Sequence, residues 1–147
     1  MKAPFLIGRL IFGGFFLYNG INHVRNREQM GPYAESKGVP NGALSVALSG
    51  IPLIIGGASL LLGVKPKLGA AAILGFLAGV SPVMHDFWRK QDPAERQTEM
   101  INFMKNAALA GGALALMGVE EPWEASVPAG QHTMGKKLRK AYRELAA

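Results

Sequence analysis

Four long apolar stretches, almost free of charge, constrain the fold of this chain more than any other feature of its sequence. They are 17 to 22 residues long: Phe5–Asn22, Ala43–Val64, Leu68–Met84 and Phe103–Val119. Together they contain two charged residues, Arg9 and Lys105. A helix rises about 1.5 Å per residue, so each stretch can cross a hydrocarbon core of roughly 30 Å. The sequence therefore predicts an all-α integral membrane protein, a bundle of four transmembrane helices.

The overall composition hides this partition. The 147 residues are 49% hydrophobic and 18% charged, as in an ordinary soluble domain. A soluble domain, however, mixes charge into most of its helices to form solvated faces, and the second and third stretches contain none. This pattern argues against a soluble enzyme. Because the chain has no cysteine, thiolate chemistry, Cys-ligated zinc and iron–sulfur clusters are excluded as well.

We expect a transmembrane domain over residues 1–119, followed by a soluble, basic, amphipathic tail over residues 120–147. The spans are predicted at about 5–23, 43–64, 68–88 and 100–119. Residues 24–42 are interpreted as a polar loop, because Gly31-Pro32 is a turn signal. The connection Val64–Lys67 is so short that the second and third spans must form an antiparallel hairpin. Asp92-Pro93 is typical of the cap and first turn of a helix.

Fourteen of the nineteen glycines lie within the four stretches. Small residues allow membrane helices to approach closely, because association in lipid depends on packing. We expect such contacts along Ala71, Gly75 and Gly79, and at the pairs Gly56-Gly57 and Gly111-Gly112.

The net charge of +6 comes from cations in loops and in the tail. Their position beside apolar spans favours anionic lipid headgroups, and not nucleic acid, as their partner. The first span lacks a small-x-small cleavage site after it, so we expect it to be retained. Four crossings place both termini on one side, where eight cations face six on the other, which favours cytoplasmic termini.

The tail has apolar residues at helical spacing among five cations, at Leu138, Tyr142 and Leu145. A helix of this kind can lie along a membrane surface or dock on a partner, although a solvated helix has the same pattern. Trp123 is interpreted as an interface anchor.

Strongly polar side chains inside spans are costly and usually face the bundle interior or an aqueous cavity. The first span carries such groups on one face, within an arc of roughly 80°: Arg9, Asn19 and His23. The fourth span carries another set at i, i+3, i+4 spacing: Asn102, Lys105 and Asn106. Antiparallel helices bring His23, the segment His85-Asp86-Phe87-Trp88 and the start of the fourth span into one leaflet.

Two interpretations of this convergence stay open. In one, Asp86 and Lys105 form an ion pair, the histidines are interfacial and Trp88 belongs to the aromatic belt. In the other, the residues line a ligand pocket that opens laterally or to the outer face. Arg9 lies near the opposite end of the bundle, where it either snorkels to headgroups or takes part in the site.

The chemistry available suits a quinone headgroup or a small anion. Two histidines carry protons near neutral pH, and a lysine donates to a carbonyl oxygen or an anion. Haem ligation by His23 and His85 is disfavoured because both lie near the membrane surface. A dinuclear metal site would need more carboxylates than Asp86 supplies.

Several short motifs occur in a recognisable order. They are Arg9-Leu10 with Gly13-Gly14, Asn19-Gly20-Ile21-Asn22-His23, Tyr33-Ala34 with Lys37-Gly38-Val39-Pro40, Gly56-Gly57, His85-Asp86-Phe87-Trp88, and Phe103-Met104-Lys105-Asn106 with Gly111-Gly112. The series resembles the DoxX family of small four-helix bacterial membrane proteins, over roughly Ala3 to Met117. Residues 120–147 match no pattern of that family.

The resemblance implies a place in the bacterial cytoplasmic (inner) membrane and a link to quinone-dependent oxidoreduction, including a subunit of thiosulfate:quinone oxidoreductase. It marks six polar positions as matching the family: Arg9, His23, His85, Asp86, Lys105 and Asn106. It also implies assembly with other membrane subunits or as a homo-oligomer.

Two hypotheses follow. In the first, the chain is a quinone-interacting subunit of a membrane oxidoreductase, without metal or covalently bound cofactor. Lys105, His85 and Asp86 then contact the headgroup, His23 exchanges its proton with water, and Asn19, Asn106, Trp88 and Arg9 complete the candidate set. In the second, the chain is an accessory subunit of a larger membrane assembly without catalysis of its own. A small-solute carrier is disfavoured, because four short helices without a visible inverted repeat leave little room for alternating access.

Overall fold

The computed structural model describes residues 3–123 and 126, which form five α-helices and one short 3₁₀-helix. The elements are α1 (Ala3–Arg25), α2 (Arg27–Ser36), α3 (Gly42–Leu62), α4 (Pro66–Met84), η1 (Phe87–Arg89) and α5 (Pro93–Met117). Four helical segments are long and apolar enough to cross a membrane: α1, α3, α4 continued through η1, and α5. The prediction of an all-α bundle of four membrane-spanning helices is confirmed.

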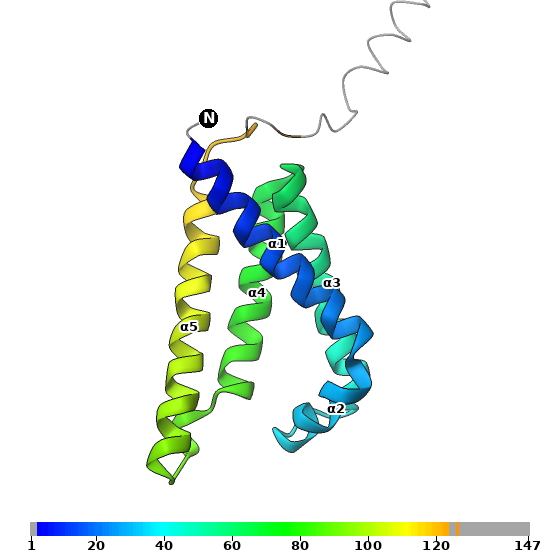
Figure 1. Cartoon of the computed structure of the whole chain (residues 1–147), viewed down its shortest axis with the longest axis vertical. Helices are drawn as coiled ribbons and strands as arrows, with labels where there is room; N and C mark the ends of the chain where they lie inside the picture. Colours follow the sequence, from blue (N-terminus) through cyan, green and yellow to red (C-terminus); the bar gives the residue numbers. More distant parts are fainter. Residues whose placement is uncertain (1–2, 124–125, 127–147) are drawn as a thin grey trace, which may run out of the picture.

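The four long helices alternate in direction, so α1 begins and α5 ends at one end of the bundle (Figure 1). We call this the terminal end, and the end that carries α2 and η1 the α2 end. Helices α3 and α4 form the expected hairpin, closed by Gly63 in the left-handed conformation (φ 68°). Asp92 caps α5 as predicted, since its carboxylate accepts a hydrogen bond from the Glu95 amide at 2.8 Å.

Helices α1 and α3 pack backbone against backbone through two pairs of glycines, Gly13 with Gly57 and Gly20 with Gly50. A Cβ atom added to Gly20 would lie 2.7 Å from the Gly50 oxygen, and one added to Gly57 would lie 2.7 Å from the Gly13 oxygen. The two glycines of each helix are seven residues apart, which is close to two helical turns and places both on one face. The glycines therefore fix the antiparallel register of α1 against α3.

The other predicted glycine contacts are only partly confirmed. Gly56 lies against Gly69 of α4, and Gly112 lies against the ring of Phe12. Gly75, Gly79 and Gly111 have no atom within 4 Å of an added Cβ, so the contacts expected there are wrong for the described part of the chain. These three glycines lie on outward faces, which a count of small residues along the sequence does not reveal.

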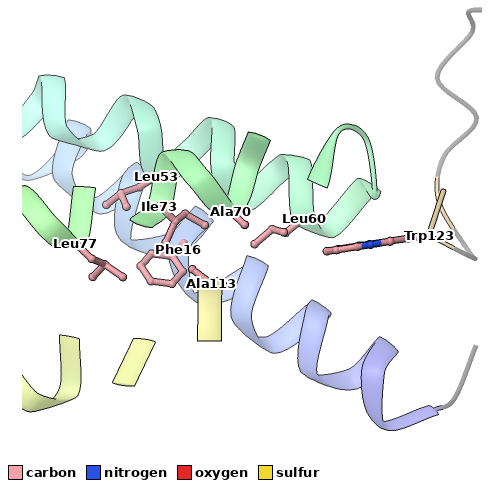
Figure 2. Packing of buried hydrophobic residues seen from close by; sticks show 8 residues of the cluster. All are labelled: Phe16, Leu53, Leu60, Ala70, Ile73, Leu77, Ala113 and Trp123. Atoms are coloured by element: carbon pink, nitrogen blue, oxygen red, sulfur yellow. The ribbon is translucent and has the colours of Figure 1, made fainter. Parts of the chain in front are cut away.

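The buried core lies between α1, α3, α4 and α5, where Phe16, Leu53, Ile73 and Leu77 meet Ala113 (Figure 2). Large apolar side chains cover much of the outside instead, such as Ile11 on α1, which is 67% exposed. In water this surface would be unfavourable, but in lipid it is the expected exterior of a membrane bundle.

Residues 24–42 contain helix α2, so the prediction of a polar loop is wrong for most of this segment. Gly31 and Pro32, expected to form a turn, lie inside the helix. Gly31 is required for packing, because an added Cβ would lie 2.7 Å from the backbone nitrogen of Ala43 at the start of α3. The contact with α3 thus overrides the local turn preference.

The tail begins by folding back over the terminal end. Trp123 is buried, with its ring at 5.1 Å and nearly perpendicular to that of Phe5. This burial is at odds with its predicted role as an interface anchor. The predicted amphipathic segment with Leu138, Tyr142 and Leu145 lies outside the described residues.

The glycine register predicts that Gly20→Ala destabilises the bundle. The new methyl group would overlap the backbones of Gly50 and Ile54, and overpacking of this kind costs about 1–3 kcal/mol. Gly14→Ala is the matched control, because nothing lies within 4 Å of the added Cβ on the same helix. Unfolding by denaturing detergent should show that Gly20→Ala is less stable than Gly14→Ala. Equal stability of the two variants would contradict the proposed register.

Candidate functional site

A cavity of about 580 Å³ lies toward the α2 end of the bundle, and residues of α1, α2, α3, α4 and α5 form its wall. Most of the wall is apolar, with Phe16, Leu53, Phe76, Leu77 and Leu109 among its residues. Its polar groups come from α1, α2, α3, α5 and the residue that follows α4: Asn19, His23, Gln29, Tyr33, Ser45, Ser49, His85 and Asn106. A concave, mostly apolar site with a few polar groups is the usual form of a small-molecule pocket.

His23 is oriented by α3. Its Nδ1 lies 2.8 Å from Ser49 Oγ, and that hydroxyl lies 2.7 Å from the carbonyl oxygen of Val46. A serine has one proton, which the geometry directs to Val46, so Ser49 accepts from His23 Nδ1–H. In the neutral imidazole this leaves Nε2 as an acceptor, which is the nitrogen that can exchange a proton.

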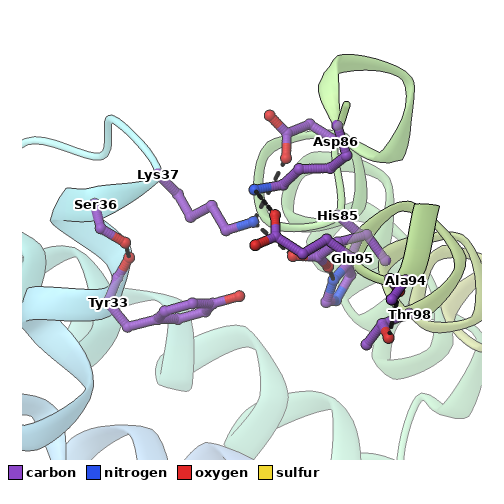
Figure 3. A network of polar contacts seen from close by, with 10 residues as sticks. Tyr33, Ser36, Lys37, His85, Asp86, Ala94, Glu95 and Thr98 are labelled. Atoms are coloured by element: carbon purple, nitrogen blue, oxygen red, sulfur yellow. Dashed lines mark hydrogen bonds and ion pairs between the residues drawn. The ribbon is translucent and has the colours of Figure 1, made fainter. Parts of the chain in front are cut away.

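His85, at the end of α4, belongs to a network that joins three parts of the chain (Figure 3). Its Nδ1 lies 2.8 Å from Glu99 Oε2, and the other oxygen of Glu99 accepts from Lys37 Nζ at 2.7 Å. Lys37 also lies 3.5 Å from Asp86 Oδ1. The Lys37 and Glu99 side chains are only 9% and 13% exposed, so the network links the end of α2 to α5 through a largely buried ion pair.

Lys37 is held in its charged form. Burial on its own would lower the pKa of the ammonium, but the hydrogen bond to Glu99 and the neighbouring negative charges outweigh it, so the pKa is raised. The ring of Tyr33 also lies below the ammonium, at 5.6 Å. Lys37 therefore stays protonated throughout the physiological pH range.

A second hollow, of about 320 Å³, lies on the other side of this network. Its wall includes Lys37, Glu99 and Tyr33, and Tyr33 also lines the cavity. His85 lines the cavity but not the hollow, whereas Glu99 lines the hollow. The hydrogen bond between His85 and Glu99 thus connects the two spaces.

The structure brings four of the predicted site residues into the cavity: Asn19, His23, His85 and Asn106. Asp86 lies beside the network and pairs with Lys37. Trp88, in η1, is half exposed and packs on Phe87 and Phe103. Both residues lie near the cavity without lining it.

The predicted ion pair between Asp86 and Lys105 is wrong. Lys105 is exposed on the outer face of α5 and does not line the cavity, so the expected contact with a headgroup there is wrong too. The inward face of α5 carries Glu99, Asn102 and Asn106 at i, i+3, i+7. Lys105 shares an i, i+3 relation with Asn102, but it lies on the outward side of that face.

Arg9 lies at the terminal end and is separate from the cavity. It is 2% exposed, so the snorkelling interpretation is wrong. Its guanidinium donates to the Leu61 carbonyl at 3.0 Å and lies 5.6 Å from the ring centre of Trp123. Leu61 is in the last turn of α3, where carbonyls lack helical partners and a positive charge is favourable.

Sequence reasoning missed Glu99, Lys37, Tyr33 and Ser49. Glu99 could have been found by continuing the Asn102 and Asn106 face back by one turn. Lys37 could not, because its partner Glu99 is 62 residues away and α2 was expected to be a loop. Residues 3–123 and 126 contain no group of three or more His, Asp or Glu side chains placed to hold a metal ion.

The fold and the cavity define a small integral membrane protein with a ligand-sized pocket inside a four-helix bundle. The sequence model of the DoxX family matches residues 5–86, more than half of the chain, so this protein belongs to the DoxX family. The match includes α1 to α4 and the cavity residues Asn19, His23 and His85. No curated protein and no solved structure matches the chain.

The network predicts that Lys37→Met strongly destabilises the protein. The substitution would leave the Glu99 and Asp86 carboxylates without their cation in a largely buried site, a change that costs on the order of 3 kcal/mol. Lys90→Met is the matched control, because Lys90 pairs at 3.5 Å with a Glu95 side chain that is mostly exposed. Such a pair contributes about 1 kcal/mol or less. Chemical unfolding in detergent should rank the two variants, and a Lys90→Met effect as large as that of Lys37→Met would contradict this assignment.

Proposed function

We propose that this protein binds the headgroup of a membrane quinone in the cavity and acts as a quinone-interacting subunit of a membrane oxidoreductase. The observation that carries the proposal is the position of His23 and His85, on different helices, in the wall of one mostly apolar cavity. A quinone has this combination of properties: an apolar ring and tail, and two oxygens that need donors and exchange protons.

The dimensions and the chemistry of the cavity support this ligand. Its volume of about 580 Å³ lies within the roughly 300–1,000 Å³ typical of small-molecule sites. His85 and the amide groups of Asn19 and Asn106 supply polar contacts for the ring oxygens, while the aromatic side chains of Phe16 and Phe76 contact the ring. The isoprenoid tail would extend from the cavity into lipid.

The ion network supplies a route for protons. Reduction of a quinone to a quinol takes up two electrons and two protons, and we propose that a redox group of another subunit supplies the electrons. Protons would pass between the hollow and the cavity through Glu99 and His85, whose side chains are hydrogen-bonded at 2.8 Å. His23, with Nε2 available, would exchange the proton at the other ring oxygen.

The proposed location is the bacterial cytoplasmic membrane, with both termini in the cytoplasm. The excess of cations on the terminal side supports this orientation. The cavity would then lie in the outer leaflet, and the hollow beside Glu95 and Thr98 would face the outer aqueous phase.

The proposal predicts saturable binding of a short-chain quinone to the purified protein in lipid nanodiscs, measured by titration calorimetry. Leu109→Trp should weaken binding at least tenfold, because the larger ring would fill the cavity. Leu114→Trp is the matched control on the same helix, since Leu114 is 55% exposed and does not line the cavity. His85→Phe should weaken binding about two- to twelvefold, because it removes one hydrogen bond that contributes 0.5–1.5 kcal/mol.

Absence of binding to the unaltered protein would contradict the proposal and favour the accessory-subunit hypothesis. If Leu109→Trp and Leu114→Trp lowered the affinity for quinone equally, the quinone would be partitioning into lipid around the bundle and not binding in the cavity. Binding of benzoate in place of quinone, sensitive to Leu109→Trp, would identify the ligand as a small anion and contradict the quinone assignment.

A further inference from the structure

Lys105 places an ammonium group on the outside of the bundle, within the apolar part of α5 but nearer the α2 end of that part. It is the central residue of the 25-residue helix α5 and is exposed. Among the residues that the structure describes, none forms a hydrogen bond or an ion pair with its side chain. A lysine in the apolar part of a membrane helix is costly unless it reaches the headgroups or pairs with an opposite charge, and no described residue of this chain pairs with Lys105.

Helix α5 is also the least covered of the four spans. Only 6% of its most apolar window is buried, compared with 22–33% for the other three. Exposed residues around Lys105 are apolar or small, among them Ile101, Met104 and Ala108. Gly111, one further turn along, has open space beside it. This side of α5, which we call the Lys105 face, thus combines a charge with a surface that allows close helix approach.

We infer that the Lys105 face binds a transmembrane helix of a different protein subunit, and that this helix carries an aspartate or glutamate opposite Lys105. A carboxylate at that depth would neutralise the ammonium and be neutralised by it, which removes the cost that each charge has alone in lipid. The inference does not depend on quinone binding, since Lys105 and the cavity lie on different sides of α5.

A second copy of this chain fits the Lys105 face poorly. In the described residues, every acidic side chain lies in a connection or in the polar ends of helices, and none lies in the apolar part of a span. Asp86 and Glu99, the two nearest that level, already pair with Lys37. A symmetric dimer on this face would also bring two Lys105 side chains together. Charge complementarity therefore favours a different chain.

Snorkelling is the competing explanation for Lys105. Side chains of a helix lean toward its N-terminus, which for α5 is the α2 end, so the ammonium could extend toward the headgroups. A snorkelling lysine needs no protein partner, and its replacement by methionine would leave assembly unchanged.

The inference is tested by a photoreactive benzoylphenylalanine at Met104 of the full-length protein, irradiated in the membranes of its native host. Met104 is 63% exposed next to Lys105. We expect a crosslink to another membrane protein that has an acidic residue within a transmembrane helix. The same amino acid at Ile11, 67% exposed on α1, is the control and should crosslink to that protein at least tenfold less.

Charge exchange then separates a specific pair from chance proximity. Lys105→Glu in the Met104 background should lower the crosslink yield at least tenfold, and changing the acidic residue of the partner to lysine should restore it. Lys105→Met should also lower the yield while leaving stability in detergent as high as that of the unaltered protein, which excludes misfolding as the cause. Crosslinks only to lipid or to a second copy, or a yield that neither Lys105 variant changes, would overturn the inference.

Discussion

The contact between the backbones of α1 and α3 is the constraint on which the site depends. Gly20 and Gly50 allow the two helices to approach until their backbones touch. This close contact fixes the positions of the neighbouring residues of α1 relative to those of α3. Ser49 precedes Gly50, and His23 is one turn beyond Gly20. The hydrogen bond between His23 and Ser49, at 2.8 Å, is therefore a consequence of the glycine register. In lipid, where hydrophobic exclusion does not drive helices together, such packing has to supply the specificity.

The α2 end is held together in a different way. Helices α1 and α5 diverge toward this end (Figure 1), and the cavity at this end is lined by residues of all five α-helices. The ion pair between Lys37 and Glu99 joins α2 to α5 across this divergence, and the hydrogen bond from His85 adds the end of α4. Packing thus closes the terminal end, whereas a polar network bridges the α2 end. This difference leaves a cavity at one end of a bundle that is well packed at the other.

The four spans could be predicted from the sequence because charge is so unevenly distributed along it. Antiparallel topology was enough to bring His23, His85 and Asn106 to one level, and all three line the cavity. Helix α2 could not be predicted, because its Gly31 and Pro32 suit a turn locally and the helix depends on contact with α3. The position of Lys105 was missed for a geometric reason. Residues at i, i+3 and i+4 define a broad face, and its inward centre depends on packing, which places Glu99 and Asn106 inside and Lys105 outside.

The central claim is that a quinone headgroup binds in the cavity at the α2 end of the bundle, and photoaffinity labelling tests it most directly. The purified protein in nanodiscs is irradiated with an azidoquinone, and the labelled residues are identified by mass spectrometry. The predicted result is labelling confined to residues that line the cavity, such as Phe16 of α1, Phe76 of α4 and Leu109 of α5, and abolished by excess unlabelled quinone. Labelling spread over lipid-facing residues such as Ile11 and Leu114, unaffected by the competitor, would contradict it.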